Sequence, residues 1–86
     1  MNQSATPNAV RPLFEIAADI RKNWPKVNYA AEPYLQAMSQ LDKVTDTYGV
    51  EDGKTQVLYF LSNATSWRGD DAKRIKAELK KMAGIK

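Results

Sequence analysis

Two stretches with apolar residues at helical spacing lie on either side of Gly69, and this feature limits the fold more than any other. Residues 70–82 predict a helix with one apolar side, formed by Ala72, Ile75, Leu79 and Met82. Residues 54–66 predict another that is apolar around more than half of its circumference, through Val57, Leu58, Phe60, Leu61 and Ala64. Gly69 has no Cβ and suits the left-handed conformation that ends many helices. We therefore predict a tight corner at Trp67 and Gly69, with Asp70 or Asp71 capping the second helix.

Prolines divide the first half of the chain. Pro12 stands at the expected first helical position, and Pro25 disfavours helical geometry at Trp24. The apolar residues between the two prolines predict a helix over residues 12–24: Leu13, Ile16, Ala17, Ile20 and Trp24. A second helix is predicted over residues 31–41, because Pro33 is tolerated in a first turn, whereas a start at Asn28 would require a kink.

The remaining segments are expected to lack long regular structure. Residues 1–10 are small and polar and predict a flexible N-terminal arm. Residues 42–53 predict a long loop that holds at most a turn of helix, with bends at Gly49 and Gly53. Residues 11–86 are thus predicted to form a single small all-α domain of about four helices. In this prediction the third helix is central, the first and fourth helices flank it, and Trp24 and Trp67 lie in the core.

Composition excludes several classes of chemistry. The 86 residues include neither cysteine nor histidine, so a disulfide framework and the usual zinc sites are excluded. A small domain without disulfides favours a reducing compartment, and the cytoplasm is the predicted location. No apolar stretch approaches the roughly 18 to 20 residues that span a bilayer. We expect neither export nor membrane insertion.

Positive charge is concentrated near the C-terminus. Residues 68–86 hold seven basic and three acidic residues, although the whole chain carries a net charge of only +3. The candidate contacts for an anionic partner are Arg68, Lys73, Lys76, Lys80 and Lys81. A simpler interpretation is that these lysines form a solvated helix face. Two helices joined by a short turn also resemble helix-turn-helix geometry, but Asp70 and Asp71 at the start of the second helix would repel phosphates.

Two other groups of residues allow a functional and a structural interpretation. Trp67 and Arg68 could stack on a base or pair with a phosphate, but a tryptophan at a helix corner is more often part of the core. An acidic loop could bind a hard cation, but its spacing does not match an EF-hand, so helix capping or solubility is the preferred interpretation of Asp42, Asp46, Glu51 and Asp52. We predict no catalytic residues, no metal and no cofactor.

The function predicted from these features is a non-enzymatic binding module. A protein partner or self-association is placed first, because the apolar surplus of residues 54–66 can leave a patch on the surface. Nucleic acid is the alternative partner, bound through the basic face of the C-terminal helix.

The segment LYFLSNATSWRGDDAKRIKAEL, the upstream VNYAAEPYLQAM and the Tyr48–Gly49 pair resemble a small uncharacterised family of bacterial and phage proteins. The resemblance covers roughly residues 13–82, and its most specific part follows the pattern YFLSNAxxWRGxxAxxIKxEL. It implies the helix corner near Gly69. It implies no activity, ligand or partner, and no functional residue is transferred from it.

Overall fold

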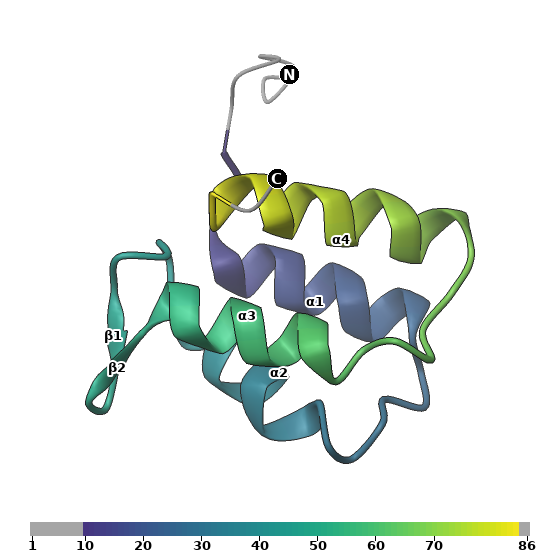
Figure 1. Ribbon diagram of the computed structural model, residues 1–86, viewed down its shortest axis with the longest axis horizontal. Coiled ribbons are helices and arrows are strands. Elements are labelled where there is room, and N and C mark those ends of the chain that lie inside the picture. The colour runs from purple at the N-terminus through teal and green to yellow at the C-terminus, as the bar shows by residue number, and fades with distance from the viewer. Residues whose placement is uncertain (1–9, 85–86) are drawn as a thin grey trace.

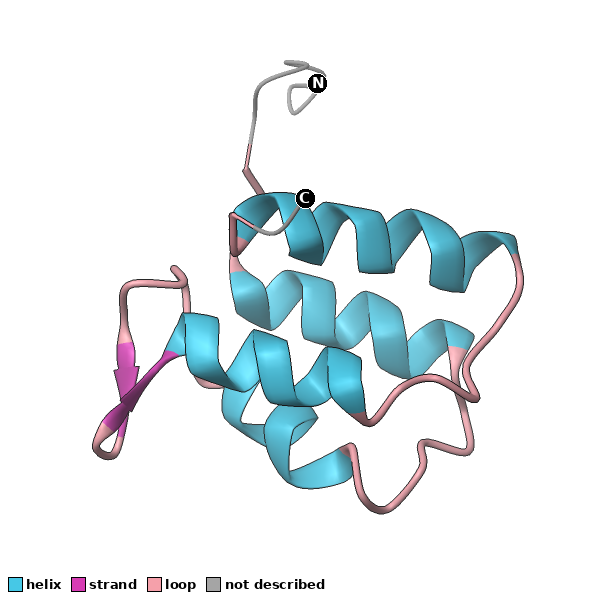
Figure 2. Ribbon diagram, viewed as in Figure 1, coloured by secondary structure: helices cyan, strands magenta, loops and turns pink. Residues whose placement is uncertain are grey.

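The computed structural model describes residues 10–84, in which helices predominate (Figures 1 and 2). Within this range the helices are α1 (Leu13–Asn23), α2 (Glu32–Met38), α3 (Gly53–Ser62) and α4 (Asp70–Met82). Two short strands, β1 (Thr47–Tyr48) and β2 (Glu51–Asp52), pair in antiparallel orientation. The prediction of a mostly helical fold is confirmed. Apart from the exposed Val10, the predicted N-terminal arm lies outside the described residues.

Helices α1 and α4 follow the sequence pattern closely. Leu13, Ile16, Ala17 and Ile20 of α1 are buried as predicted, whereas Trp24 follows the helix as its C-cap and is half-buried. Helix α4 has the predicted bounds. Pro12 precedes the first helical residue and does not occupy it. Helix α2 is shorter than predicted, since it ends at Met38, and Leu41 is buried although it lies beyond the helix.

The corner between α3 and α4 differs from the predicted tight turn. Helix α3 ends at Ser62, so residues 63–69 form the connection. Gly69 has the positive φ that we expected (+112°), but with ψ 178° it is extended and not left-handed helical. Gly69 is also the N-cap of α4, which has no side-chain cap, so the prediction that Asp70 or Asp71 caps this helix was wrong. Both carboxylates lie in the first turn, where they interact favourably with the helix dipole.

Residues 42–52 form a small hairpin and contain no turn of α-helix. Gly49 and Val50 connect the strands, and only Gly49 has a positive φ (+68°), as in a two-residue hairpin turn with glycine first. The hairpin leads directly into α3, whose N-cap Asp52 accepts a hydrogen bond from the Thr55 amide at 2.9 Å. Gly53 allows close packing here, because a Cβ would lie 2.8 Å from the carbonyl oxygen of Lys43.

The four helices pack in a ring, in which α1 contacts α2 and α4, and α3 contacts the same two helices. One cluster of buried residues includes members of every helix, with Phe60 of α3 the largest fully buried side chain. The prediction of a central third helix needs correction, because Leu58 and Tyr59 on the outer side of α3 are exposed (36% and 45%). Helix α3 therefore shares the core with its neighbours and does not lie at its centre.

Both tryptophans contribute to this packing, as predicted. Trp67 is only 4% exposed, and Trp24 is half-buried against the core. Their rings stack with centroids 5.3 Å apart and an interplanar angle of 5°. Phe60 meets Trp67 edge to face, with the ring centroids 6.5 Å apart. This aromatic cluster fixes the connection after α3 against the end of α1.

Candidate binding surfaces on the fourth helix

Helix α4 places six of its eight charged residues on two solvent-facing sides that flank one buried row. The buried row consists of Ala72, Ile75 and Leu79, which pack into the core. One flanking side carries Asp71, Arg74 and Glu78 and lies next to α1. The other carries Lys73, Lys76 and Lys80. We call these the paired side and the basic side.

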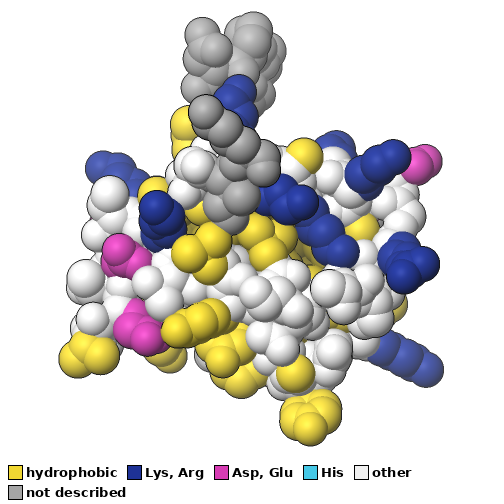
Figure 3. All heavy atoms as spheres, in the orientation of Figure 1, with side chains coloured by type: hydrophobic (Ala, Val, Ile, Leu, Met, Phe, Trp, Pro, Cys, Tyr) yellow, Lys and Arg dark blue, Asp and Glu magenta, His cyan; other side chains and the backbone are white. Residues whose placement is uncertain are grey.

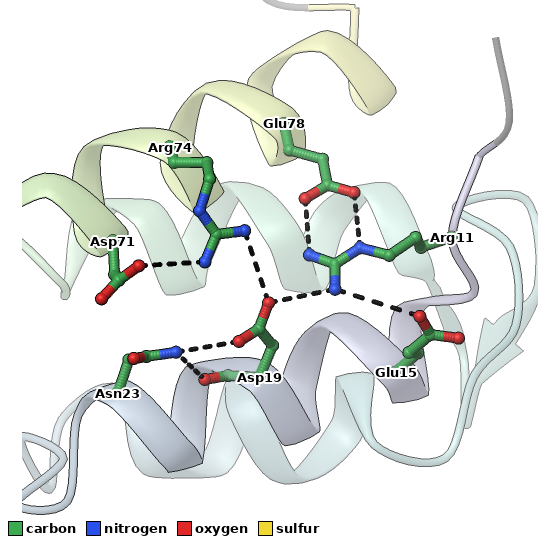
Figure 4. A network of polar contacts seen from close by, with 7 residues as sticks. All are labelled: Arg11, Glu15, Asp19, Asn23, Asp71, Arg74 and Glu78. Atoms are coloured by element: carbon green, nitrogen blue, oxygen red, sulfur yellow. Dashed lines mark hydrogen bonds and ion pairs between the residues drawn. The ribbon is translucent and has the colours of Figure 1, made fainter. Parts of the chain in front are cut away.

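On the paired side, Arg11 links the start of α1 to α4 (Figure 4). Its Nε donates to Glu78 Oε2 at 2.9 Å, and its Nη2 donates to Glu78 Oε1 at 2.7 Å. The third nitrogen, Nη1, donates to Asp19 Oδ2 at 3.0 Å. The guanidinium is thus held by carboxylates from two helices, in the bidentate geometry that favours arginine over lysine.

Asp19 extends this network along α1. It lies 3.5 Å from Arg74, which also donates to Asp71 at 3.1 Å, and it accepts a hydrogen bond from Asn23 at 2.8 Å. Burial alone would raise the pKa of Asp19, but hydrogen bonds and charges from Arg11 and Arg74 lower it below its ordinary value. Hydrogen bonding to Glu78 outweighs burial in the same way and raises the pKa of Arg11. The charges on this side are therefore largely matched within the fold.

The basic side has no comparable set of carboxylates. Lys73 and Lys80 are exposed, as is Arg68 in the connection before α4, and Lys76 is half-buried between them. Within residues 10–84, none of these four cations forms an ion pair; the ion pairs found there involve only Arg11, Arg21 and Arg74. In Figure 3, dark blue lysine and arginine side chains gather over the part of the visible face where Figure 1 draws α4.

Lys76 connects the basic side to the aromatic cluster. Its Nζ donates to the carbonyl oxygen of Trp67 and lies 5.8 Å from the centroid of the Trp67 ring. The pKa of Lys76 is lowered from its ordinary value. Burial is the larger cause of this shift, and the positive charges of Lys80 and Arg68 add to it. The buried Trp67 has a core role, whereas Arg68 beside it is free to meet a ligand.

The structure separates Lys81 from the other predicted contacts. Lys81 lines a groove of about 910 Å³ near the end of α4, together with residues 42–44 and Val10 and Arg11. Lys43 lines the same groove, and we call it the Lys43–Lys81 groove. Sequence analysis missed Lys43 as a functional candidate, because no local pattern indicates that the segment before the hairpin returns to the end of α4.

The acidic residues near the hairpin serve the fold. Asp46 accepts hydrogen bonds from the main-chain amides of Asp42 and Lys43, at 3.2 and 2.9 Å, and these bonds lower its pKa. Asp52 caps α3, and Glu51 accepts a hydrogen bond from the buried Gln56 at 3.0 Å. In the part of the chain that the structure describes, no three acidic side chains gather as metal ligands would. None of the helices described there is long and apolar enough to cross a membrane.

Comparison with protein-family models, with curated proteins and with solved structures gives no match. Membership in a family of bacterial and phage proteins therefore stays a prediction from the sequence motif.

Proposed function

We propose that this chain is a non-enzymatic binding module that binds the phosphate backbone of nucleic acid through the basic side of α4. The observation that carries the proposal is the separation of charge on this helix. The acidic residues Asp71 and Glu78 meet arginines on the paired side. The positive charge of Lys73, Lys76 and Lys80 is left without carboxylate partners within the described residues.

The arrangement suits backbone contact better than base reading. Lys73 and Lys80 are seven residues apart, which is about 10 Å along a helix axis, so both can reach phosphates of one strand. Asp70 and Asp71 in the first turn oppose entry of this helix end into a groove of DNA. The basic side presents no Asn or Gln, which commonly read adenine. We therefore expect binding with little sequence preference.

The test is fluorescence anisotropy with a labelled 20-base-pair DNA duplex and with an RNA of the same sequence. With about four phosphates neutralised, affinity should fall roughly 100-fold between 50 and 200 mM salt. The variant Lys73→Glu/Lys80→Glu should lose most of the affinity, while circular dichroism shows an unchanged helix content. Lys76 is left intact, because it holds the carbonyl group of Trp67.

A matched control variant distinguishes binding through the basic side from attraction by the overall net charge. The variant Lys22→Glu/Lys54→Glu makes the same change in charge at two exposed lysines outside α4. It should retain affinity within about threefold, since charges beyond a Debye length of roughly 10 Å are largely screened. Equal loss of binding in both variants would show that only the overall charge matters and would refute the proposal.

A protein partner, which the sequence placed first, is the second candidate. The hairpin favours it, because Val50 at the turn is 100% exposed and Tyr48 beside it is 43% exposed. Self-association is the simplest form, and sedimentation velocity over a range of concentrations tests it. A monomer at every concentration would exclude self-association. A cytoplasmic location and a place in a bacterial or phage family belong to the same proposal, supported by the lack of cysteine and by the motif around Trp67.

A further inference from the structure

The Lys43–Lys81 groove is held open by contacts between distant parts of the chain. The amide of Leu13 donates to the carbonyl oxygen of Asp42 at 2.8 Å. The amide of Phe14 donates to the carbonyl oxygen of Leu41 at 2.9 Å. Arg11 then ties this end of α1 to α4 through Glu78. The walls of the groove are therefore set by the fold, and a ligand needs no large rearrangement to enter.

The groove has an apolar lining. Val44 and Met82 are half-buried against the core, and Ala77 and Val10 are exposed beside them. Covering these side chains is favourable when the occupant brings apolar groups of its own, because a polar occupant would lose hydration without gaining partners. A nucleic acid backbone has no such groups. The groove thus differs in chemistry from the basic side of α4.

The charged lining of the groove is positive. It includes Arg11, Arg74 and Glu78 of the paired side, whose charges are matched within the fold. The remaining charged residues are Lys43, Lys81 and Asp42, so the unmatched charge sums to +1. Glu78 already accepts two hydrogen bonds from Arg11. Lys43 and Lys81 come from different elements, and within residues 10–84 neither forms an ion pair. Asp46 near Lys43 is bound by main-chain amides. An occupant with carboxylates would complement the two lysines.

We propose that the Lys43–Lys81 groove docks an acidic amphipathic segment of a partner protein. The apolar side chains of such a segment would cover Val44 and Met82, and its carboxylates would pair with Lys43 and Lys81. An amphipathic helix with acidic residues beside its apolar row has both features. The inference rests on the second proposed function, binding of a protein, and names the chemistry of that partner.

A library of random 16-residue peptides displayed on filamentous phage provides the probe. Selection on the full chain should enrich sequences that combine Asp or Glu with apolar residues three or four positions apart. A synthetic copy of the strongest binder should lose at least about tenfold in affinity for Lys43→Glu/Lys81→Glu, because two attractive charges become repulsive. The variant Lys22→Glu/Lys54→Glu, with the same change in net charge, should bind it as the parent does.

The other outcomes separate this inference from the function on which it rests. Enrichment of neutral or basic peptides would overturn the acidic partner but leave a protein-binding role in place. Failure to enrich any peptide over a control protein would count against both. A concentration-dependent dimer that disappears in the Lys43→Glu/Lys81→Glu variant would show that a second copy fills the groove, and would overturn the proposal. If the charge reversals reduce helicity, Lys43→Gln/Lys81→Gln replaces them, with a smaller loss expected.

Discussion

The two solvent-facing sides of α4 carry three charged residues each, but the fold treats them in opposite ways. On the paired side, Arg74 pairs with Asp19 of α1 and donates to Asp71, and Glu78 accepts hydrogen bonds from Arg11, which precedes α1. Lys73 and Lys80 on the basic side are exposed and have no ion pair in the described part of the chain. One side stabilises the folded chain, and the other leaves its charge available to a ligand.

This difference shows why a count of charges is a poor guide to function. A matched set of charges that is half-buried between helices contributes to stability, whereas exposed unmatched charges contribute little to it and much to long-range attraction. Mutations should therefore separate the two sides. Changes on the paired side should lower stability, and changes on the basic side should lower affinity for an anionic ligand.

The largest effect is expected from Trp67→Ala, which removes the ring beneath the basic side. Trp67 is 4% exposed and stacks on Trp24, and replacement of a buried tryptophan by alanine costs about 3–5 kcal/mol. In a domain of this size the melting temperature should fall by more than about 12 °C. Thermal unfolding followed by circular dichroism measures the change.

The control for Trp67→Ala is Tyr29→Ala, at an aromatic residue that is 88% exposed. This variant should melt within about 4 °C of the parent, since surface substitutions rarely exceed about 0.5 kcal/mol. An unchanged melting temperature for Trp67→Ala would contradict the core role. The corner would then be better interpreted as a binding surface.

A smaller effect is expected from Arg11→Ala on the paired side. The side chains of Arg11, Glu78 and Asp19 are only 27%, 28% and 20% exposed, so two half-buried carboxylates would lose their main partner. Loss of hydrogen bonds to charged groups on this scale costs about 2 kcal/mol. Urea unfolding at pH 7 measures the change in the free energy of unfolding.

Arg21→Ala is the matched control, because Arg21 also donates two hydrogen bonds to one carboxylate, that of Glu32 (3.1 and 2.7 Å). Both members of that pair are about 40% exposed, and an exposed pair contributes less than about 1 kcal/mol. Equal costs for Arg11→Ala and Arg21→Ala would mean that the paired side stabilises the fold no more than any surface ion pair does.

The parts of the fold that follow from local pattern could be predicted from the sequence. Helices α1 and α4 have regular apolar rows, and Pro12 and Pro25 mark the limits of α1, so both helices lie close to their predicted bounds. The buried position of Trp67 also follows from its place between two helices. These features depend on neighbours within a few turns of the chain.

The parts that depend on distant contacts could not be predicted. The hairpin strands have two residues each, too few to show an alternating pattern. Hydrogen bonds from the Gly53 amide to the Asp46 carbonyl oxygen and from the Lys54 amide to the Val44 carbonyl oxygen join the segment before β1 to the start of α3. Arg11 and Glu78 are 67 positions apart in the sequence. The basic residues could therefore be identified from the sequence. Only the folded chain shows which acidic residues already pair with arginines, and that Lys81 lies apart from Lys73.

The smallest change in stability is expected when the pH is lowered, and this change also distinguishes the two sides most sharply. In the folded state the pKa of Asp19 lies below its ordinary value of 3.8, so its stabilising contribution is complete above that pH and is lost as the pH falls through the folded pKa. The variant Asp19→Asn loses the charge that faces Arg11 and Arg74, so it should be less stable than the parent at pH 7 by about 1 kcal/mol, the upper end for such pairs. This difference should shrink as the pH falls below about 4. Urea unfolding at pH 7, 4 and 3 measures it.

Glu15→Gln on the same helix is the control, because Glu15 is 55% exposed and lies 4.0 Å from Arg11. Its difference from the parent should be small at every pH. A constant difference between Asp19→Asn and the parent from pH 7 to 3 would show that the Asp19 charge does not stabilise the fold. Acid protonates carboxylates, and Lys73, Lys76 and Lys80 of the basic side include none. Affinity for an anion that keeps its charge in acid, such as dextran sulfate, should therefore persist until the chain unfolds. A loss of affinity that precedes unfolding would place a titrating carboxylate in the binding surface, against the separation of the two sides.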